Sequence, residues 1–276
     1  MANSIARLAW LAPLALFSED ALAWGLYTHV YFTQLLIWAI PLADPRFRAA
    51  VRRLPDLLLA GACLPDVALV GRYTGAPAFN TTHQWSVARR LLARAHDDET
   101  RVLALGYASH LLADVVAHNH FVPAHEQMWL DRPVVTHAAS EWAMDAHVTP
   151  HLFARPAELL NRHRQRVVDY AAEHFGCGRD ASGRALVCLG NGEALLRASR
   201  LPQLLLRGAG ALDGRLRRRF DWYIAETAAR LGQINRVIEG DAPVWHAEID
   251  GASRAEARAP ALTSRAFGQP LPQDFF

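Results

Sequence analysis

Apolar residues recur every three or four positions along most of this chain, the spacing that places them on one face of a helix. In the clearest stripe Thr227 is the one polar member: Phe220, Ile224, Thr227, Leu231, Ile234 and Ile238. The same periodicity predicts helices over residues 24–40, 46–59, 86–95, 100–118, 136–147, 157–175 and 192–200, with prolines between most of them. No alternating strand pattern, internal repeat or glycine-rich phosphate loop is visible. The pattern therefore predicts an all-α fold, a single compact multi-helix domain over residues 24–250.

The N-terminal segment has the form of an export signal. Arg7 is followed by an apolar run over residues 8–17, and Ala21 and Ala23 are the small residues that a signal peptidase reads. The run is shorter than the roughly 20 apolar residues that span a bilayer. We therefore predict a signal peptide over residues 1–23, a mature chain that begins at Trp24, and a periplasmic or secreted protein. The Ala-, Arg- and Pro-rich segment 251–276 is predicted to be a loosely ordered tail.

Composition narrows the function only slightly. The formal net charge of +2 is too small to indicate nucleic-acid binding by itself. Cys177 and Cys188 flank a glycine-containing segment that we expect to be a turn, and an exported protein would allow them to form a disulfide. The remaining cysteine, Cys63, is expected to be a small buried hydrophobic residue.

The candidate chemistry lies in the histidines. His110 and Asp114 are four residues apart, as are His137 and Glu141, and on a helix each pair shares one face with side chains about 6 Å apart. His120 lies between the two pairs, where the first helix should end. A lone histidine on an apolar face is more often a packing residue than a ligand. Two such pairs with a further histidine between them predict a metal site, and imidazole and carboxylate groups suit zinc.

The predicted signal cut adds to this pattern. Cleavage before Trp24 would free an amine and place a carbonyl beside it, and both are good metal ligands. His29 follows little more than one helical turn later.

At this point the chain resembles a known family. The motifs His-x3-Asp-x5-His and His-x3-Glu, after an N-terminal Trp and an early His, are similar to those of the bacterial zinc-dependent phospholipases C and their relatives, the fungal and plant single-strand-specific nucleases. The resemblance runs from Trp24 to about Glu141. Both families are all-α enzymes with three zinc ions in a cleft. The resemblance therefore implies a helical Zn2+ enzyme that holds up to three ions.

Carried over to this sequence, the resemblance implies nine metal ligands: Trp24, His29, Asp66, His83, His110, Asp114, His120, His137 and Glu141. Asp66 matches a Pro-Asp motif, with a turn or helix-cap residue as the alternative, and His83 is placed mainly by its order in the chain. Asp66 or Asp114 is expected to bridge two ions, because a carboxylate can bridge and a neutral imidazole cannot. Asp66 is also the candidate catalytic residue, which would orient or deprotonate the water that attacks phosphorus.

Three positions around His120 depart from the family pattern. His118 stands where the phospholipases usually have Pro, Ala113 replaces Gly or Thr, and Pro123 replaces Asn. His118 or His125 is therefore an alternative ligand in place of His120.

Four aromatic residues near these ligands are either core residues or the face that holds a quaternary ammonium headgroup or a nucleobase: Tyr73, Phe79, Trp85 and Phe121. The basic run over residues 215–219 is expected to be a solvated helix start, with contact to an anionic lipid surface as the alternative.

Three functions remain open from the sequence. The first is an exported zinc-dependent phospholipase C that releases diacylglycerol and a phosphorylated headgroup; its phospholipid substrate would bring it into transient contact with membranes. The second is a single-strand-specific nuclease or nucleotidase with the same metals. The third is a non-catalytic metal-binding protein. The Trp24-x4-His29 spacing favours the nuclease branch, whereas Glu141 favours the phospholipase branch. No feature calls for an obligate protein partner.

Overall fold

The computed structural model describes residues 25–129 and 133–247. Within these ranges the regular elements are all helical, with no strand, so the all-α prediction is confirmed. The predicted signal peptide 1–23, the predicted N-terminal ligand Trp24 and the tail 251–276 lie outside the described residues.

The elements follow one another along the chain with short connections. They are α3 (Leu26–Trp38), α4 (Pro45–Arg53), α5 (Pro55–Gly61), η2 (Pro65–Val67), α6 (Ala68–Thr74), η3 (Pro77–Thr81), α7 (Trp85–Arg94), α8 (Asp98–Val116), η4 (Ala117–Phe121), α9 (Val122–Met128), α10 (Pro133–Val148), η5 (Thr149–His151), α11 (Pro156–Arg162), α12 (Arg164–Phe175), α13 (Arg179–Ala198), α14 (Leu201–Leu212), α15 (Leu216–Leu231) and α16 (Ile234–Ile238).

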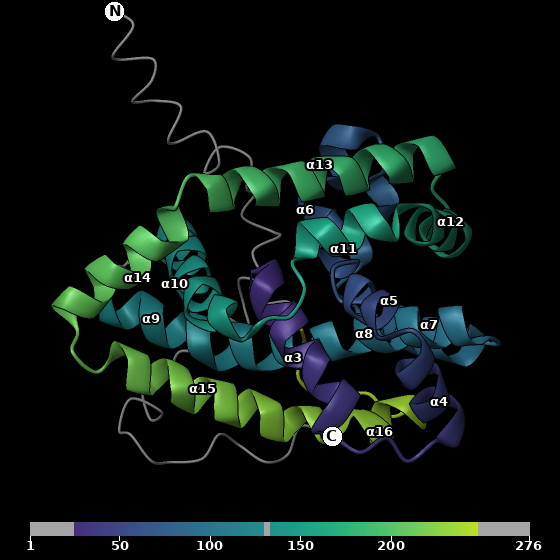
Figure 1. The fold of residues 1–276 in the computed structure, drawn as a ribbon, viewed down its shortest axis with the longest axis horizontal. Helices are drawn as coiled ribbons and strands as arrows, with labels where there is room; N and C mark the ends of the chain where they lie inside the picture. The colour runs from purple at the N-terminus through teal and green to yellow at the C-terminus, as the bar shows by residue number, and fades with distance from the viewer. Residues whose placement is uncertain (1–24, 130–132, 248–276) are drawn as a thin grey trace, which may run out of the picture.

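Helix α8 forms the centre of the molecule, with α3, α4, α5, α7 and α15 packed around it (Figure 1). It begins at a capping box in which the Asp97 side chain accepts the Thr100 amide at 2.8 Å. From Val102 to Val116 every residue is buried, because neighbours surround the helix on all sides. The residues that α8 carries in its last two turns are therefore held in the interior.

The α5–α8 crossing is unusually close. A Cβ at Gly106 would overlap the Leu58 carbonyl oxygen, and a Cβ at Gly61 would overlap the backbone of Leu103. Glycine at both positions lets the two backbones touch. This contact brings the segment after α5, which contains Asp66, onto the face of α8 that contains His110.

The helix boundaries differ from the sequence prediction where local breaks intervene. The helix expected over 46–59 is split before Pro55, and the one expected over 157–175 is split at His163. Helix α13 starts at Arg179, well before the predicted position, and runs through the segment expected to be a turn. Cys177 therefore lies just before α13, and Cys188 lies in the middle of it. Both are free thiols, so the disulfide prediction is wrong. Cys63 is fully buried, as expected.

Helices α13 and α14, together with α15, enclose the bundle. In Figure 1, α13 runs along one long side, α15 along the opposite side, and α14 joins them at one end of the molecule. Helix α14 was not among the helices predicted from the sequence. Among the described residues no single helix is long and apolar enough to cross a membrane, and one bent pair, α5 with Pro65–Thr74, passes by length and composition only.

Candidate metal centre

Five of the predicted ligands meet in the interior of the bundle. His29 comes from α3, Asp66 from η2, His83 from the turn before α7, and His110 and Asp114 from α8. All five are buried. Two groups among them could hold a metal ion, His29 with Asp66 and His110, and His83 with His110 and Asp114, with ligand atoms within 4.8 Å of one another in each group.

Asp114 faces histidines on both sides. Its Oδ1 lies 3.2 Å from Nε2 of His29, while its Oδ2 lies 2.9 Å from Nε2 of His110 and 3.6 Å from Nε2 of His83. Asp66 completes the set, with Oδ1 3.6 Å from Nε2 of His83 and 3.7 Å from Nε2 of His110. Two oxygens of one carboxylate thus point at different imidazoles, which is the arrangement that a bridging ligand requires.

The imidazole of His110 is oriented by the backbone. Its Nδ1 donates to the Ala62 carbonyl at 2.7 Å, which leaves Nε2 directed at the carboxylates. A ring nitrogen that donates to a carbonyl fixes the tautomer in which the other nitrogen can bind a metal. The Ala62 carbonyl is available here because of the close α5–α8 crossing.

His83 is held by its neighbour in the turn. The Thr82 hydroxyl donates to the Pro65 carbonyl at 2.7 Å, and the Tyr107 hydroxyl donates to the Thr82 carbonyl. These bonds connect the turn to η2 and to α8. As a result, Nε2 of His83 lies 3.3 Å from Nε2 of His110 although His83 lies outside any regular element.

A third group lies where η4 meets α10. His118, His137 and Glu141 are buried and bring one ligand atom each within 4.8 Å of the others. Nε2 of His137 is 2.7 Å from Oε1 of Glu141, and the rings of His118 and His137 are edge to face with centroids 5.5 Å apart. The predicted helical pair on α10 is therefore joined by a histidine of η4.

That histidine is His118 and not His120. The chain continues from α8 into η4, a single π-helical turn, and such turns are frequent at functional sites. Both ring nitrogens of His118 are buried without a hydrogen-bond partner. The His120 ring instead packs against Trp245, with centroids 5.2 Å apart, and is in none of the three groups found among the described residues. The geometry thus favours the alternative ligand His118, whose signal in the sequence is the series His110, Asp114, His118 at every fourth position.

The electrostatics of the site favour bound cations. Asp66, Asp114 and Glu141 are all buried, and an unneutralised buried carboxylate is costly. Burial, together with the charges of Asp114 and Asp66, raises the pKa of Glu141 well above its usual value. The pKa of Asp114 is held well below its usual value: burial opposes this, but His110 and His29 outweigh it.

The donor set fits zinc. Both ring nitrogens of His29 and both oxygens of Asp114 are buried and close to one another, yet no hydrogen bond satisfies them. Nε2 of His29 lies 3.2 Å from Oδ1 of Asp114, close enough for one cation to contact both atoms. Imidazole nitrogens mixed with carboxylate oxygens are the donors that zinc prefers.

One buried network that the sequence analysis missed connects the two ends of this site. Asp145 follows His137 and Glu141 at the same four-residue spacing on α10. Its Oδ1 accepts the amide of Thr28 at 2.9 Å and the hydroxyl of Thr28 at 2.7 Å, which caps the start of α3. Its Oδ2 accepts from Arg197 at 2.6 Å. Asp145 therefore fixes α3, which carries His29, to the helix that carries the third group.

The same network leaves no room at the start of α3. A Cβ at Gly25 would overlap the Asp145 carboxylate. Arg197 also pairs with Glu193 and lies over the Tyr27 ring at 4.4 Å. A residue with a side chain therefore does not fit at position 25, which directly follows the predicted first residue of the mature chain.

The structure shows where the remaining candidate residues from the sequence lie. Phe79, Trp85 and Phe121 are core residues, whereas Tyr73 is exposed. The ring of His125 is enclosed by Phe121, Trp129, Phe220 and Tyr223, and its Nδ1 donates to the Phe121 carbonyl at 2.7 Å.

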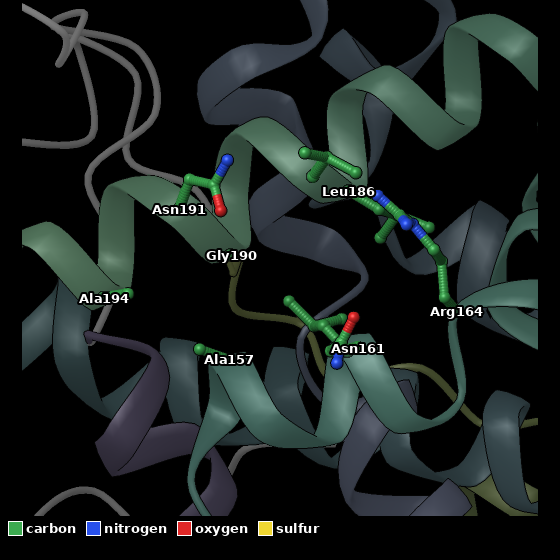
Figure 2. Close-up of a pocket in the computed structure, with 9 residues that line it drawn as sticks. Ala157, Asn161, Arg164, Leu186, Gly190, Asn191 and Ala194 are labelled. Carbon is green, nitrogen blue, oxygen red and sulfur yellow. The ribbon is translucent and has the colours of Figure 1, made fainter.

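A separate hollow of about 150 Å³ lies between α11 and α13 (Figure 2). Asn161, Arg164 and Asn191 are its polar lining residues. None of the predicted ligands lines it, and we assign it no role.

We expect the zinc-free protein to lose stability in mild acid. Burial lowers the pKa of His118 and of His120 to about 4 and that of His125 to about 3, against about 6.5 in an unfolded chain. Below about pH 6.5 these histidines are therefore protonated in the unfolded chain but neutral in the folded protein. The free energy of unfolding falls by up to about 1.4 kcal/mol per pH unit for each histidine. The raised pKa values of Glu141, Asp145 and Glu193 have the opposite sign. The pKa values of His110, His163 and His174 are lowered by burial as well and add to the loss, so the histidines outnumber these carboxyls. The melting temperature of the chelated protein should fall between pH 7 and pH 5, and a flat profile would contradict the burial of these rings.

The fold and these groups define an all-α protein with buried clusters of metal-ligating residues. The family model described as zinc dependent phospholipase C matches residues 28–177, more than half of the chain. The chain therefore belongs to the zinc-dependent phospholipase C family, which implies hydrolase activity. Comparison with curated proteins and with solved structures gave no match.

Proposed function

We propose that this protein is an exported zinc-dependent phosphodiesterase, a phospholipase C that hydrolyses phospholipids to diacylglycerol and a phosphorylated headgroup. The family and the buried ligand groups support this proposal. The observation that carries it is the position of Asp114, whose two oxygens face His29 on one side and His110 with His83 on the other. This suits two ions that share a ligand, the arrangement used for in-line attack on phosphate esters.

In this proposal the ligands divide into three sets. Asp66, His83, His110 and Asp114 hold one ion. His29 and the second oxygen of Asp114 hold another, together with the amine and carbonyl of Trp24. His118, His137 and Glu141 hold the third.

Each part of the site then has a chemical task. Zinc, when bound, lowers the pKa of water and stabilises charge on the phosphate. Asp66 orients the attacking water or accepts its proton, as its position beside His83 and His110 allows. The Ala62 carbonyl keeps the His110 tautomer constant through the reaction.

The proposed export step supplies a ligand, so an N-terminal extension should remove it. A variant with one extra residue before Trp24 should contain one zinc fewer than the mature protein, because the amine ligand becomes a peptide nitrogen. The close packing of Gly25 against Asp145 should prevent α3 from shifting to accommodate the added residue. Zinc content measured by mass spectrometry tests this, with an extension at the C-terminus as the control. Equal zinc content in the two variants would exclude the N-terminal amine as a ligand.

The nuclease reading remains the competing function, because the Trp24-x4-His29 spacing favours it. The deciding experiment offers phosphatidylcholine vesicles and single-stranded DNA in parallel to the mature, zinc-loaded protein, with a chelated control. Chelator-sensitive release of phosphocholine alone supports the phospholipase. Release of nucleotides alone assigns the protein to the nuclease branch. No release from either substrate, with zinc still bound, favours the non-catalytic alternative.

A further inference from the structure

One face of α14 carries apolar side chains into solvent. The helix has the sequence LPQLLLRGAGAL, in which Arg207 is the only charged residue. Its exposed positions are Leu204, Arg207, Gly208, Ala211 and Leu212, with Leu204 51% and Leu212 92% exposed. A helix that is apolar on all sides is normally buried on all sides. No other described residue covers this face.

The opposite face of α14 is fully used. Leu201 and Leu205 pack against Ala138 and Trp142 of α10 and against Leu196 of α13. Helix α10 carries His137 and Glu141 one residue before these two contact positions. The exposed face is therefore one helix away from the proposed metal centre and is rigidly attached to it.

Positive charge borders the apolar face. Arg207 lies on α14 itself, and Arg215, Arg217 and Arg218 are exposed where the chain turns into α15. None of these four guanidinium groups pairs with a carboxylate among the described residues, whereas the neighbouring Arg219 pairs with Asp213 at 2.8 Å. Figure 1 places this corner of α14 and α15 at one end of the molecule, far from α4.

We infer that this surface, Leu204, Gly208, Ala211 and Leu212 with Arg207, Arg215, Arg217 and Arg218, docks the protein on a membrane that contains anionic phospholipid. Apolar side chains that enter the acyl boundary, flanked by arginines at the headgroup level, are the two components of interfacial binding. A second copy of the chain would bring the same four arginines against these, so charge opposes a symmetric dimer here. The inference deepens the proposed function by supplying a contact with the surface on which its substrate lies.

The test measures binding separately from turnover. Holoprotein is sedimented with vesicles made of non-hydrolysable phosphonate analogues of phosphatidylcholine and phosphatidylglycerol in equal parts, or of the phosphatidylcholine analogue alone. We expect stronger binding to the anionic vesicles. The double variant Leu204→Gln, Leu212→Gln should bind at least about tenfold more weakly, since it removes most of the buried apolar area. Both side chains are exposed and glutamine is a good helix former, so the fold should persist.

A charge pair of variants provides the matched control. Arg207→Glu should weaken binding to the anionic vesicles, whereas Arg52→Glu, an exposed arginine of α4 at the other end of the molecule, should leave it nearly unchanged. Equal losses would mean that only net charge matters and would overturn the inference. Unaltered vesicle binding by the double leucine variant would also overturn the inference. If that variant then dissociated a dimer, the face would bind a second copy of the chain. If it instead had a lower melting temperature, the face would bind residues 251–276.

Failure of the inference and failure of the proposed function give different results. Hydrolysis of a monomeric short-chain phospholipid should be the same in the double leucine variant and the parent, while hydrolysis of vesicles should fall with binding. If the parent hydrolyses neither lipid, the phospholipase proposal fails, but the vesicle-binding result still decides the role of α14.

Discussion

Replacing Asp114 with asparagine is expected to remove two metal ions at once and to abolish most activity. The carboxylate of Asp114 faces His29 through one oxygen and the His83–His110 pair through the other. An asparagine retains the size but offers a single weak ligand oxygen and no charge. Loss of metal-derived stabilisation of several kcal/mol corresponds to a fall in kcat/KM of about a thousandfold or more.

Zinc content is the decisive measurement for this variant. We expect a loss of two ions per chain, and a loss of only one would show that Asp114 does not bridge. Asp221→Asn is the matched control, because Asp221 also pairs with a histidine, His147 at 2.7 Å, but on the surface and outside the metal groups. The control should retain zinc, activity and melting temperature. The Asp114 variant should also melt earlier than the parent, since bound metal stabilises the folded chain.

His118→Gln and His120→Gln are expected to have opposite effects on metal binding. The two residues are equally buried and only two positions apart, but only His118 brings a ring nitrogen to His137 and Glu141. Loss of His118 should remove one zinc and reduce kcat/KM by roughly a hundredfold or more, because the third ion loses one of three protein ligands. Loss of His120 should retain the zinc and cost stability only, about 1–3 kcal/mol from a repacked buried site next to Trp245.

Comparing the two variants distinguishes His118 from His120 as the ligand of the third ion, which a single variant would not do. The spacing of the family motif favours His120, whereas the π-helical turn of η4 favours His118. If His120→Gln lost zinc and His118→Gln retained it, the ligand set of the third ion would have to follow the motif. Melting temperatures of both variants, measured with and without chelator, distinguish loss of a ligand from loss of packing.

A buried network at the start of α3 bears on both predictions, because it holds α3 against α10. Asp145 joins the α3 residue Thr28 to α10, and Arg197 and Glu193 complete a buried network around that joint. Neither Asp145 nor Arg197 belongs to a metal group, but they set the separation between His29 and the His137–Glu141 pair. Their place in the sequence gave only one hint, the continuation of the α10 series to a third position.

The sequence by itself determined the features that depend on local spacing. Helical periodicity repeats every three to four residues, so it predicts an all-α chain, and the same spacing predicts that His110 with Asp114 and His137 with Glu141 each share a helix face. Residue chemistry, mixed imidazole and carboxylate, was enough to favour zinc. None of these conclusions depends on how one helix packs against another.

Tertiary structure alone decided what depends on contacts between distant segments. The α5–α8 crossing, permitted by Gly61 and Gly106, positions Asp66 against His110. The π-helical turn brings His118 to His137 and Glu141, whereas the ring of the equally buried His120 packs against Trp245. The start of α13 removes the expected turn between the two cysteines, and the packing of α14 on α10 determines which of its apolar faces remains in solvent. Burial and helix crossing are properties of the assembled bundle, and a periodic pattern along one segment does not encode them.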